Sequence, residues 1–165
     1  KSARTVIHML CDIVSKNGNL RLNIGTRADG TITGEETQVL LKTGQWLQVN
    51  GEAIYGTRPW KIFGEGPTES ASGSFADQKI PFNAKDIRFT TRGDTLFAIV
   101  LGLPDEKTEI KSLGLNAGNG IIEKIDMVGS SGKIKWAQGR NGLEISPSES
   151  YPCEDAIVYK ILFRK

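Results

Sequence analysis

Residues Asn19 to Gly25 read N-L-R-L-N-I-G, and the fold class of this chain follows from them. Leu20, Leu22 and Ile24 alternate strictly with polar residues, which is the period of a β-strand. Helical patterns flank this predicted strand on both sides. A lone strand between two helices can neither pair its backbone groups nor bury both of its faces. We therefore expect it to be the last strand of a larger barrel or sheet lying upstream, with apolar side chains that are covered by another chain or unusually exposed.

The segments on either side of this strand are predicted to be amphipathic helices. Apolar residues recur at three- and four-residue steps from Ser2 onward, and a stop signal at Asn17 ends that run. Thr33 and Glu36 have the spacing of a capping box at the start of the second helix, which is expected to end at Asn50. Helix, strand and helix in succession are the repeating unit of an α/β protein.

Beyond Trp60 the sequence is typical of an all-β region. Helical periodicity vanishes there, and short alternating runs are separated by turns that contain glycine. Residues 87–90 and 95–101 flank Gly93 and predict a hairpin. Further strands are predicted at 110–115, 121–128, 133–137, 143–145 and 156–163. About eight short strands favour a β-sandwich. The segment 64–85 is longer than an ordinary connection, and we expect a mobile loop there rather than a functional one.

Composition and charge exclude several classes of function. The 21 Lys and Arg and the 19 Asp and Glu are interspersed, so the net charge of +2 favours neither nucleic acid nor an anionic membrane. No apolar run approaches the roughly 20 residues of a membrane helix. Cys11 and Cys153 are too few for a zinc cluster or a disulfide framework, so we expect no metal and no cofactor, and interpret both as structural or incidental. His8, the single histidine, lies in a helical apolar pattern and is interpreted as a packing residue.

Four long motifs stand out in this sequence: K-N-G-N-L-R-L-N-I-G-T-R-A-D-G-T-I at 16–32, N-G-E-A-I-Y-G-T-R-P-W at 50–60, D-I-R-F-T-T-R-G-D-T-L-F-A-I-V at 86–100 and G-L-E-I-S-P at 142–147. Together they resemble glycoside hydrolase family 29, the α-L-fucosidases. Long motifs in one order are a stronger signal than a short glycine pattern. The resemblance implies an α+β chain in which residues 1–54 are a helix-strand-helix remnant of a (β/α)8 barrel and residues 55–165 are an antiparallel β-sandwich.

The same resemblance implies that the complete enzyme hydrolyses terminal α-L-fucose with retention. Its aspartate nucleophile and its carboxylic acid/base are expected upstream, because retaining chemistry needs two carboxyl groups ~5 Å apart and no pair in this chain matches the family motifs. The acidic pairs present are interpreted as a helix first turn or solvated turns. They are Glu35 with Glu36, Asp105 with Glu106, and Glu154 with Asp155. We therefore expect this segment to be structural and to have no catalytic residue.

The partners implied are the upstream barrel and, through the complete enzyme, fucosylated glycans. The family resemblance also suggests a secreted, periplasmic or lysosomal location, and the residues of this chain by themselves do not indicate one.

The loop after the predicted barrel strand is the part of this chain expected nearest to the substrate, because barrel enzymes place their sites on that face. The residues expected there are Asn23, Gly25, Thr26 and Arg27. For Asn23 and Arg27 the alternative is loop capping and turn hydrogen bonding. The sequence departs from the family pattern at three places: Arg21 stands where an aliphatic residue is usual, Thr26 replaces a common proline, and Thr33-Gly34 replaces Pro-Glu.

Trp60 and Trp136 offer a second possible sugar surface, because flat aromatic faces often contact carbohydrate. Trp60 follows Arg58-Pro59 at the entry to the sandwich, and Trp136 alternates with Ile134, so both are expected to pack in the core. An alternative function, a non-catalytic carbohydrate-binding module, would instead expose a coplanar aromatic pair beside polar side chains. A pure interaction domain would show a large apolar patch far from the helices.

Overall fold

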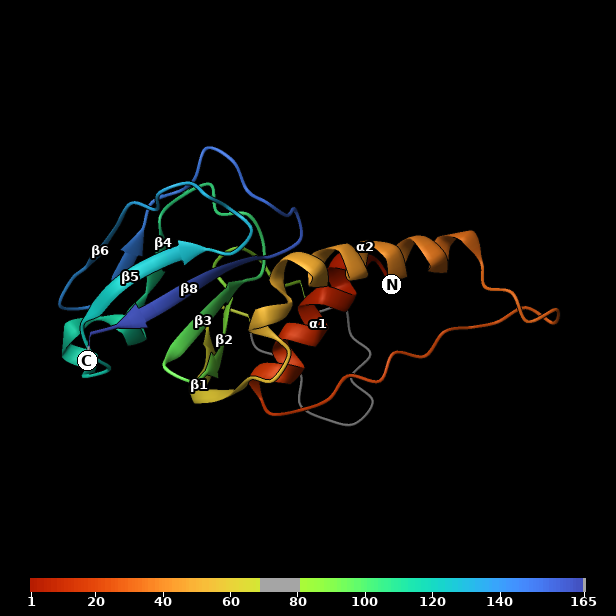
Figure 1. Ribbon diagram of the computed structural model, residues 1–165, viewed down its shortest axis with the longest axis horizontal. Helices are drawn as coiled ribbons and strands as arrows, with labels where there is room; N and C mark the ends of the chain where they lie inside the picture. Colours follow the sequence, from red (N-terminus) through yellow and green to blue (C-terminus); the bar gives the residue numbers. More distant parts are fainter. Residues whose placement is uncertain (69–80, 165) are drawn as a thin grey trace.

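The computed structural model describes residues 1–68 and 81–164, which form two α-helices followed by two antiparallel sheets (Figure 1). The helices are α1 (Ala3–Ser15) and α2 (Gly34–Asn50), and the short 3-10 turns are η1 (Gly51–Ala53), η2 (Lys111–Leu113) and η3 (Leu115–Ala117). The strands are β1 (Arg58–Glu65), β2 (Ile87–Arg92), β3 (Thr95–Val100), β4 (Thr108–Ile110), β5 (Ile122–Met127), β6 (Trp136–Gln138), β7 (Leu143–Ile145) and β8 (Ile157–Phe163). Much of the loop predicted at 64–85, residues 69–80, lies outside the described residues.

Local signals set the bounds of α1, and the prediction for this helix is confirmed. The Ser2 Oγ accepts a hydrogen bond from the Thr5 N–H at 3.2 Å, which satisfies a donor of the first turn. At the other end Asn17 has a left-handed φ of 66°, and the Gly18 N–H donates to the Ile13 carbonyl at 2.8 Å. A left-handed residue followed by such a hydrogen bond is a common way in which the last carbonyl groups of a helix find donors.

The second helix also begins and ends as predicted. The Thr33 Oγ1 accepts from the Glu36 N–H at 3.2 Å, as in the predicted capping box, and the same hydroxyl donates to the Glu36 Oε2 at 3.1 Å. Near the end of α2 the Trp46 Nε1–H donates to the Ala156 carbonyl at 2.8 Å and so ties the helix to the start of β8. Within the described residues no helix is both long and apolar enough to cross a membrane.

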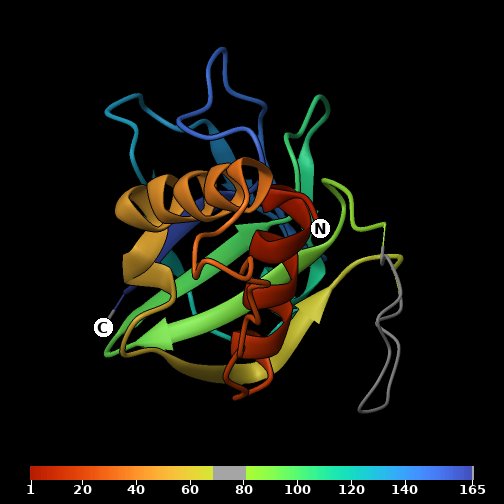
Figure 2. The ribbon, with the colours of Figure 1, turned by 90° about the vertical axis from the view of Figure 1, so that its right-hand side faces the viewer.

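The five-stranded sheet, in the order β1-β2-β3-β8-β5, separates two apolar cores. One face packs against the three-stranded sheet β4-β7-β6 and forms the sandwich, with Phe89 and Tyr159 among its buried residues. The opposite face presents Phe97, Ile99 and Val158 to the helices. Figure 2 shows α1 and α2 lying across this second face. Strands buried on both faces read as nearly continuous apolar runs, as β3 and β8 do.

The predicted strand at 19–25 does not form, so that prediction is wrong. These residues have no regular secondary structure, and the pairing next to them is an isolated antiparallel bridge between Thr26 and Ile32. A strand needs a neighbour for its backbone groups, and the described residues place none alongside. The expected exposure is seen at Leu22, which is 37% exposed, whereas Leu20 and Ile24 are half-buried.

Two further strand predictions need correction. The run predicted at 110–115 is a strand only up to Ile110, and η2 and η3 follow it, because Gly114 lies against another backbone: a Cβ there would be 2.5 Å from the Gly142 nitrogen. Strand β1 was not predicted. Its register shifts between Pro59 and Gly64, which breaks the alternation, and a Cβ at Gly64 would meet the carbonyl of Ile87.

The remaining sheet predictions are confirmed, with small shifts of the bounds. The hairpin of β2 and β3 pairs Arg92 with Thr95 across a turn in which Gly93 has a φ of 58°. The strand predicted at 133–137 is β6, displaced to Trp136–Gln138. Beyond Asp86, the described residues contain no helix longer than a 3-10 turn, as a sandwich requires.

The helix-side core generates a stability prediction. Phe97→Ala should lower the free energy of unfolding by about 3–5 kcal/mol, because the ring is fully buried between β3 and the helices. Leu115→Ala is the control, and since that side chain is 47% exposed, its effect should stay within about 0.5 kcal/mol. Urea unfolding followed by circular dichroism measures both. Equal effects would contradict a core on this face of the sheet.

Candidate functional site

The four residues expected near the substrate all lie in the loop between α1 and α2. Asn23, Gly25, Thr26 and Arg27 are exposed. Figure 1 shows this orange loop projecting beyond the helices, away from the sandwich. Within the part of the chain that the structure describes, the side chains of Asn23 and Arg27 have no hydrogen-bond or ion-pair partner. They are therefore available to a ligand or to another part of a larger protein.

The backbone of this loop is held by its own turn. The Arg27 N–H donates to the Thr31 carbonyl at 2.7 Å, and the Gly30 N–H donates to the Arg27 carbonyl at 2.9 Å. Gly30 has a φ of 82°, which glycine adopts without strain. The Asp29 carboxylate accepts from the Thr31 N–H at 3.0 Å, and hydrogen bonds from Thr31 lower the pKa of Asp29. The alternative role of Arg27 in turn hydrogen bonding thus holds for its backbone, while its guanidinium stays free.

The acidic pairs singled out in the sequence lie in an exposed helical turn, in exposed turns or in a surface ion pair. Glu35 lies in the exposed first turn of α2, where a carboxylate complements the helix dipole. Asp105 and Glu106 are exposed, and Asp155 pairs with Arg4 at 3.1 Å. Among the described residues, no group of three His, Cys, Asp or Glu side chains is arranged to hold a metal ion.

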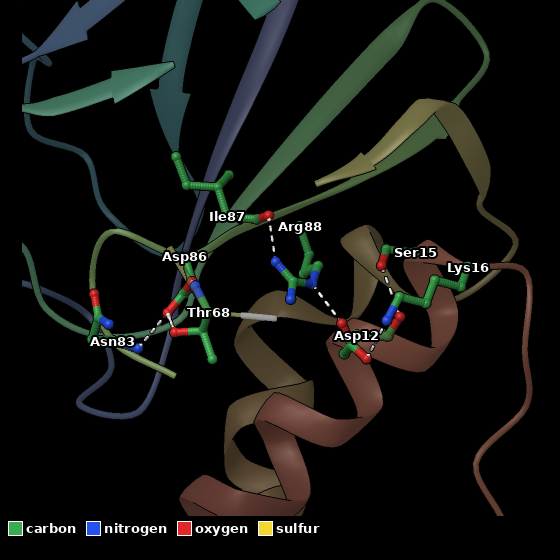
Figure 3. Close-up of polar contacts among 8 residues, drawn as sticks. All are labelled: Asp12, Ser15, Lys16, Thr68, Asn83, Asp86, Ile87 and Arg88. Atoms are coloured by element: carbon green, nitrogen blue, oxygen red, sulfur yellow. Dashed lines mark hydrogen bonds and ion pairs between the residues drawn. The ribbon is translucent and has the colours of Figure 1, made fainter. Parts of the chain in front are cut away.

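A buried arginine that sequence reasoning missed joins the helices to the sheet (Figure 3). Arg88, on β2, is 2% exposed. Its Nε–H donates to the Asp12 Oδ1 of α1 at 2.6 Å, and its Nη1–H donates to the Ile87 carbonyl at 3.0 Å. The Lys16 Nζ contacts the other carboxylate oxygen of Asp12 at 2.8 Å. We call Arg88, Asp12 and Lys16 the clamp, because this set fixes α1 on β2.

Aromatic rings complete the surroundings of the clamp. The Arg88 Cζ lies 5.5 Å from the centre of the Phe63 ring and 4.8 Å from that of Phe82, and the Lys16 Nζ lies 4.7 Å from the Phe63 ring. Such cation–π contacts favour a charge held away from water. A signal was present in the sequence, since Arg88 is a charged residue inside a strand whose neighbours are apolar. Its partner could not be known, because Asp12 is far away along the chain.

Hydrogen bonds of Thr90 and Asp86 further hold β2, the strand that carries Arg88. The Thr90 Oγ1 donates to the Ala53 carbonyl of η1 at 2.7 Å. Asp86 is fully buried and accepts from the Thr68 N–H at 2.9 Å and from the Asn83 N–H at 2.8 Å (Figure 3). The carboxylate of Asp86 therefore organises the backbone that leads into β2.

His8 and the two cysteines are packing residues, as predicted. His8 is buried, its Nε2–H donates to the Asp155 carbonyl at 2.8 Å, and its ring meets the Phe82 ring edge-on. Burial lowers the pKa of His8, although the hydrogen bond to the backbone opposes this shift. Cys11 and Cys153 are free thiols, and burial raises the pKa of both. A raised thiol pKa favours the unreactive protonated form.

Trp60 and Trp136 were expected to lie in the core, whereas the structure places both at its edge. Both are half-buried and contact the sandwich core. The Trp60 ring meets the Phe89 ring at an interplanar angle of 65° with centroids 5.1 Å apart, which is an edge-to-face contact. The Trp60 ring is thus packed against a buried ring of the sandwich core.

Comparison with known proteins agrees with this arrangement. The family model described as alpha-L-fucosidase matches residues 1–52, and that described as alpha-L-fucosidase C-terminal domain matches residues 81–162. The tissue alpha-L-fucosidase of Homo sapiens is 33% identical over 164 residues, covering 94% of this chain and 30% of the human protein. The alpha-L-fucosidase of Branchiostoma floridae is 29% identical, and 32% of its length is covered.

The solved structures support the same assignment. The crystal structure of the Thermotoga maritima alpha-fucosidase superimposes with a TM-score of 0.74 at 28% identity, covering 98% of this chain and 35% of that one. Helices docked on an antiparallel sandwich thus define a glycoside hydrolase segment with an accessory β-domain, and the predicted α+β class is confirmed. The chain belongs to the α-L-fucosidase family, glycoside hydrolase family 29. It spans about a third of the length of the relatives that it matches.

The clamp generates a prediction about burial of charge. Asp12→Ala should lower the free energy of unfolding by about 3–5 kcal/mol, because it leaves the buried Arg88 guanidinium without its counter-ion. The matched control is Asp126→Ala, which removes an exposed pair with Lys124 and should cost less than about 1 kcal/mol.

A double variant separates the loss of the ion pair from the cost of leaving an unpaired charge buried. Asp12→Leu with Arg88→Met should recover most of the stability, because a buried pair replaced by apolar groups is often nearly neutral. Urea denaturation measures all the variants. If Asp12→Ala were as mild as Asp126→Ala, the clamp would not be holding α1.

His8 generates a prediction about pH. Because burial lowers the pKa of folded His8 below its unfolded value of about 6.5, the unfolded chain binds more protons between these two values. Stability should therefore be complete above about pH 6.5 and fall as the pH drops below it. His8→Gln keeps a donor for the Asp155 carbonyl but does not titrate, so it should flatten the change between about pH 7 and pH 5.5. Thermal melting measures both curves, and parallel curves would contradict the role of His8.

Proposed function

We propose that this chain is the C-terminal segment of a retaining α-L-fucosidase that hydrolyses terminal α-L-fucose from glycoconjugates, and that the segment itself is structural. Membership of the family supports the activity. A Thermotoga maritima relative that is 28% identical was solved in complex with fucose, which supports fucose as the sugar recognised. The proposal extends to the division of the chain, with residues 1–54 ending the catalytic barrel and residues 55–165 forming the sandwich. That division is supported by the end of η1 at Ala53 and the start of β1 at Arg58.

The observation that carries the structural role is the clamp. Lys16, one of its members, is the C-cap residue that follows the last residue of α1, Ser15, and the segment that leads to Asn23 and Arg27 begins there. The sheet holds α1 through Arg88 and holds α2 through the Ala156 carbonyl, which accepts from Trp46. The sandwich is therefore a buttress: it fixes both helices from which the loop departs. Precise placement matters, since an error of 1 Å in a substrate contact can cost about 100-fold in rate.

The chemistry is proposed to come from the rest of the enzyme. A carboxylate nucleophile attacks the anomeric carbon while a carboxylic acid protonates the leaving oxygen, and water then hydrolyses the glycosyl-enzyme. Within this chain, the Asn23 amide and the Arg27 guanidinium are proposed to donate hydrogen bonds to sugar hydroxyls, with Gly25 and Thr26 shaping the backbone between them. The exposed apolar residues Leu22 and Leu41 are proposed to face the upstream barrel.

A non-catalytic carbohydrate-binding module is the weaker reading. Such a module needs exposed, coplanar aromatic faces, whereas Trp60 and Trp136 pack on the core. The ring of the exposed Phe63 already makes cation–π contacts with Lys16 and Arg88. The described residues therefore favour a buttress over a sugar-binding surface.

The test is release of the aryl group from an aryl α-L-fucoside. The 165-residue chain by itself should show no turnover, and the complete enzyme that contains it should be active, because loss of the nucleophile or the acid alone is severe. Both proteins are assayed at equal concentration. Clear turnover by the 165-residue chain would place catalytic carboxylates within it, and inactivity of the complete protein would refute the proposed fucosidase.

A further inference from the structure

Glu36 makes contacts that its neighbour Glu35 does not make. The Glu36 Oε1 accepts a hydrogen bond from the Gly25 N–H at 3.2 Å, and its Oε2 accepts from the Thr33 Oγ1 at 3.1 Å. One carboxylate therefore joins the capping box of α2 to a backbone amide that lies 11 residues earlier in the chain. Sequence reasoning assigned Glu36 to the helix cap alone, because a cap can be recognised from spacing and the second contact cannot.

The contact with Gly25 is the loop's attachment to α2. The other hydrogen bonds between residues 19 and 32 are internal, such as those of Arg27 with Thr31 and Gly30. Among the described residues, the Gly25–Glu36 bond is the one hydrogen bond that joins this stretch to a helix. Without it, the turn would keep its shape but lose its orientation relative to α2.

The chemistry of this contact suits a permanent tether. A carboxylate is a stronger acceptor than a neutral oxygen, so a backbone amide that donates to it is held firmly. The contact does not depend on glycine, since a Cβ at position 25 would lie at an ordinary distance of 3.4 Å from the Glu36 Oε1. Both oxygens of Glu36 are already engaged in these contacts, which leaves the group poorly placed to act as an acid or a nucleophile.

We propose that Glu36 is a positioning residue for the substrate loop: through the Gly25 amide it holds Asn23 and Arg27 where they meet the sugar. This role rests on the proposed function. When the tether is removed, the loop adopts several orientations, and only a fraction of the molecules have the one that binds substrate. The apparent affinity for substrate is reduced in proportion to that fraction. Once the substrate is bound the loop is in place again, so the chemical step is unaffected.

The experiment compares three variants of the complete enzyme. Glu36→Ala removes both contacts and should raise KM for an aryl α-L-fucoside about 10-fold with little change in kcat. Glu36→Gln keeps the shape and an acceptor for Gly25, and should restore most of the affinity. Glu35→Ala is the matched control on the same helical turn, and it should behave as the unaltered enzyme. A fall in kcat at unchanged KM would indicate fewer folded molecules and would overturn the positioning role.

Hydrogen exchange followed by mass spectrometry provides a readout that needs no activity. In the complete enzyme, the peptide that contains Gly25 should exchange about 10-fold faster in Glu36→Ala than in Glu35→Ala. Unchanged exchange in an active enzyme would overturn the tether while leaving the proposed function intact. A complete protein that has no fucosidase activity would overturn the proposed function and the positioning role together.

Discussion

The ion pair between Arg88 and Asp12 is the contact on which the rest of this structure depends. A guanidinium that is 2% exposed has lost nearly all of its hydration, and only a well-placed carboxylate and further hydrogen bonds can offset that loss. The ion pair therefore fixes the position of α1 along β2 and its rotation about its own axis. Apolar contacts alone would allow it to slide, because hydrophobic burial is not directional.

The clamp also explains why the sandwich and the helices are inseparable. The five-stranded sheet is apolar on both faces, and the face with Phe97, Ile99 and Val158 would be a large exposed patch without its helices. The helices in turn bury Ile7 and Trp46 in a core that they share with this face of the sheet. Each layer thus requires the other to cover its apolar surface.

In the proposed function, this chain contributes the placement of one loop rather than reactive groups. The loop leaves α1 next to Lys16, which the clamp holds, and returns to α2 next to Glu36, which holds Gly25. Charged contacts therefore fix both ends. A loop fixed in this way suits the proposed enzyme, in which the catalytic carboxylates lie on the barrel. The chemistry requires the substrate hydroxyls to be held rigidly while the anomeric centre reacts.

Signals that act over a few residues could be read from the sequence alone. The Ser2 and Thr33 caps, the ending at Asn17 and the Gly93 hairpin all concern backbone groups close in the chain, so residue type and spacing were sufficient. The family motifs likewise placed Asn23, Gly25, Thr26 and Arg27 in one loop.

Contacts between distant residues were decided by the tertiary structure. Alternation at 19–25 indicated a strand, but a strand exists only where a neighbour pairs with it, and the register shift in β1 depends on the backbone of Ile87. Arg88 and Asp12 are 76 residues apart, and Glu36 reaches Gly25 only because the loop folds back. The sequence indicates that a charged side chain needs a partner. The packing of the chain determines which partner comes within hydrogen-bond distance.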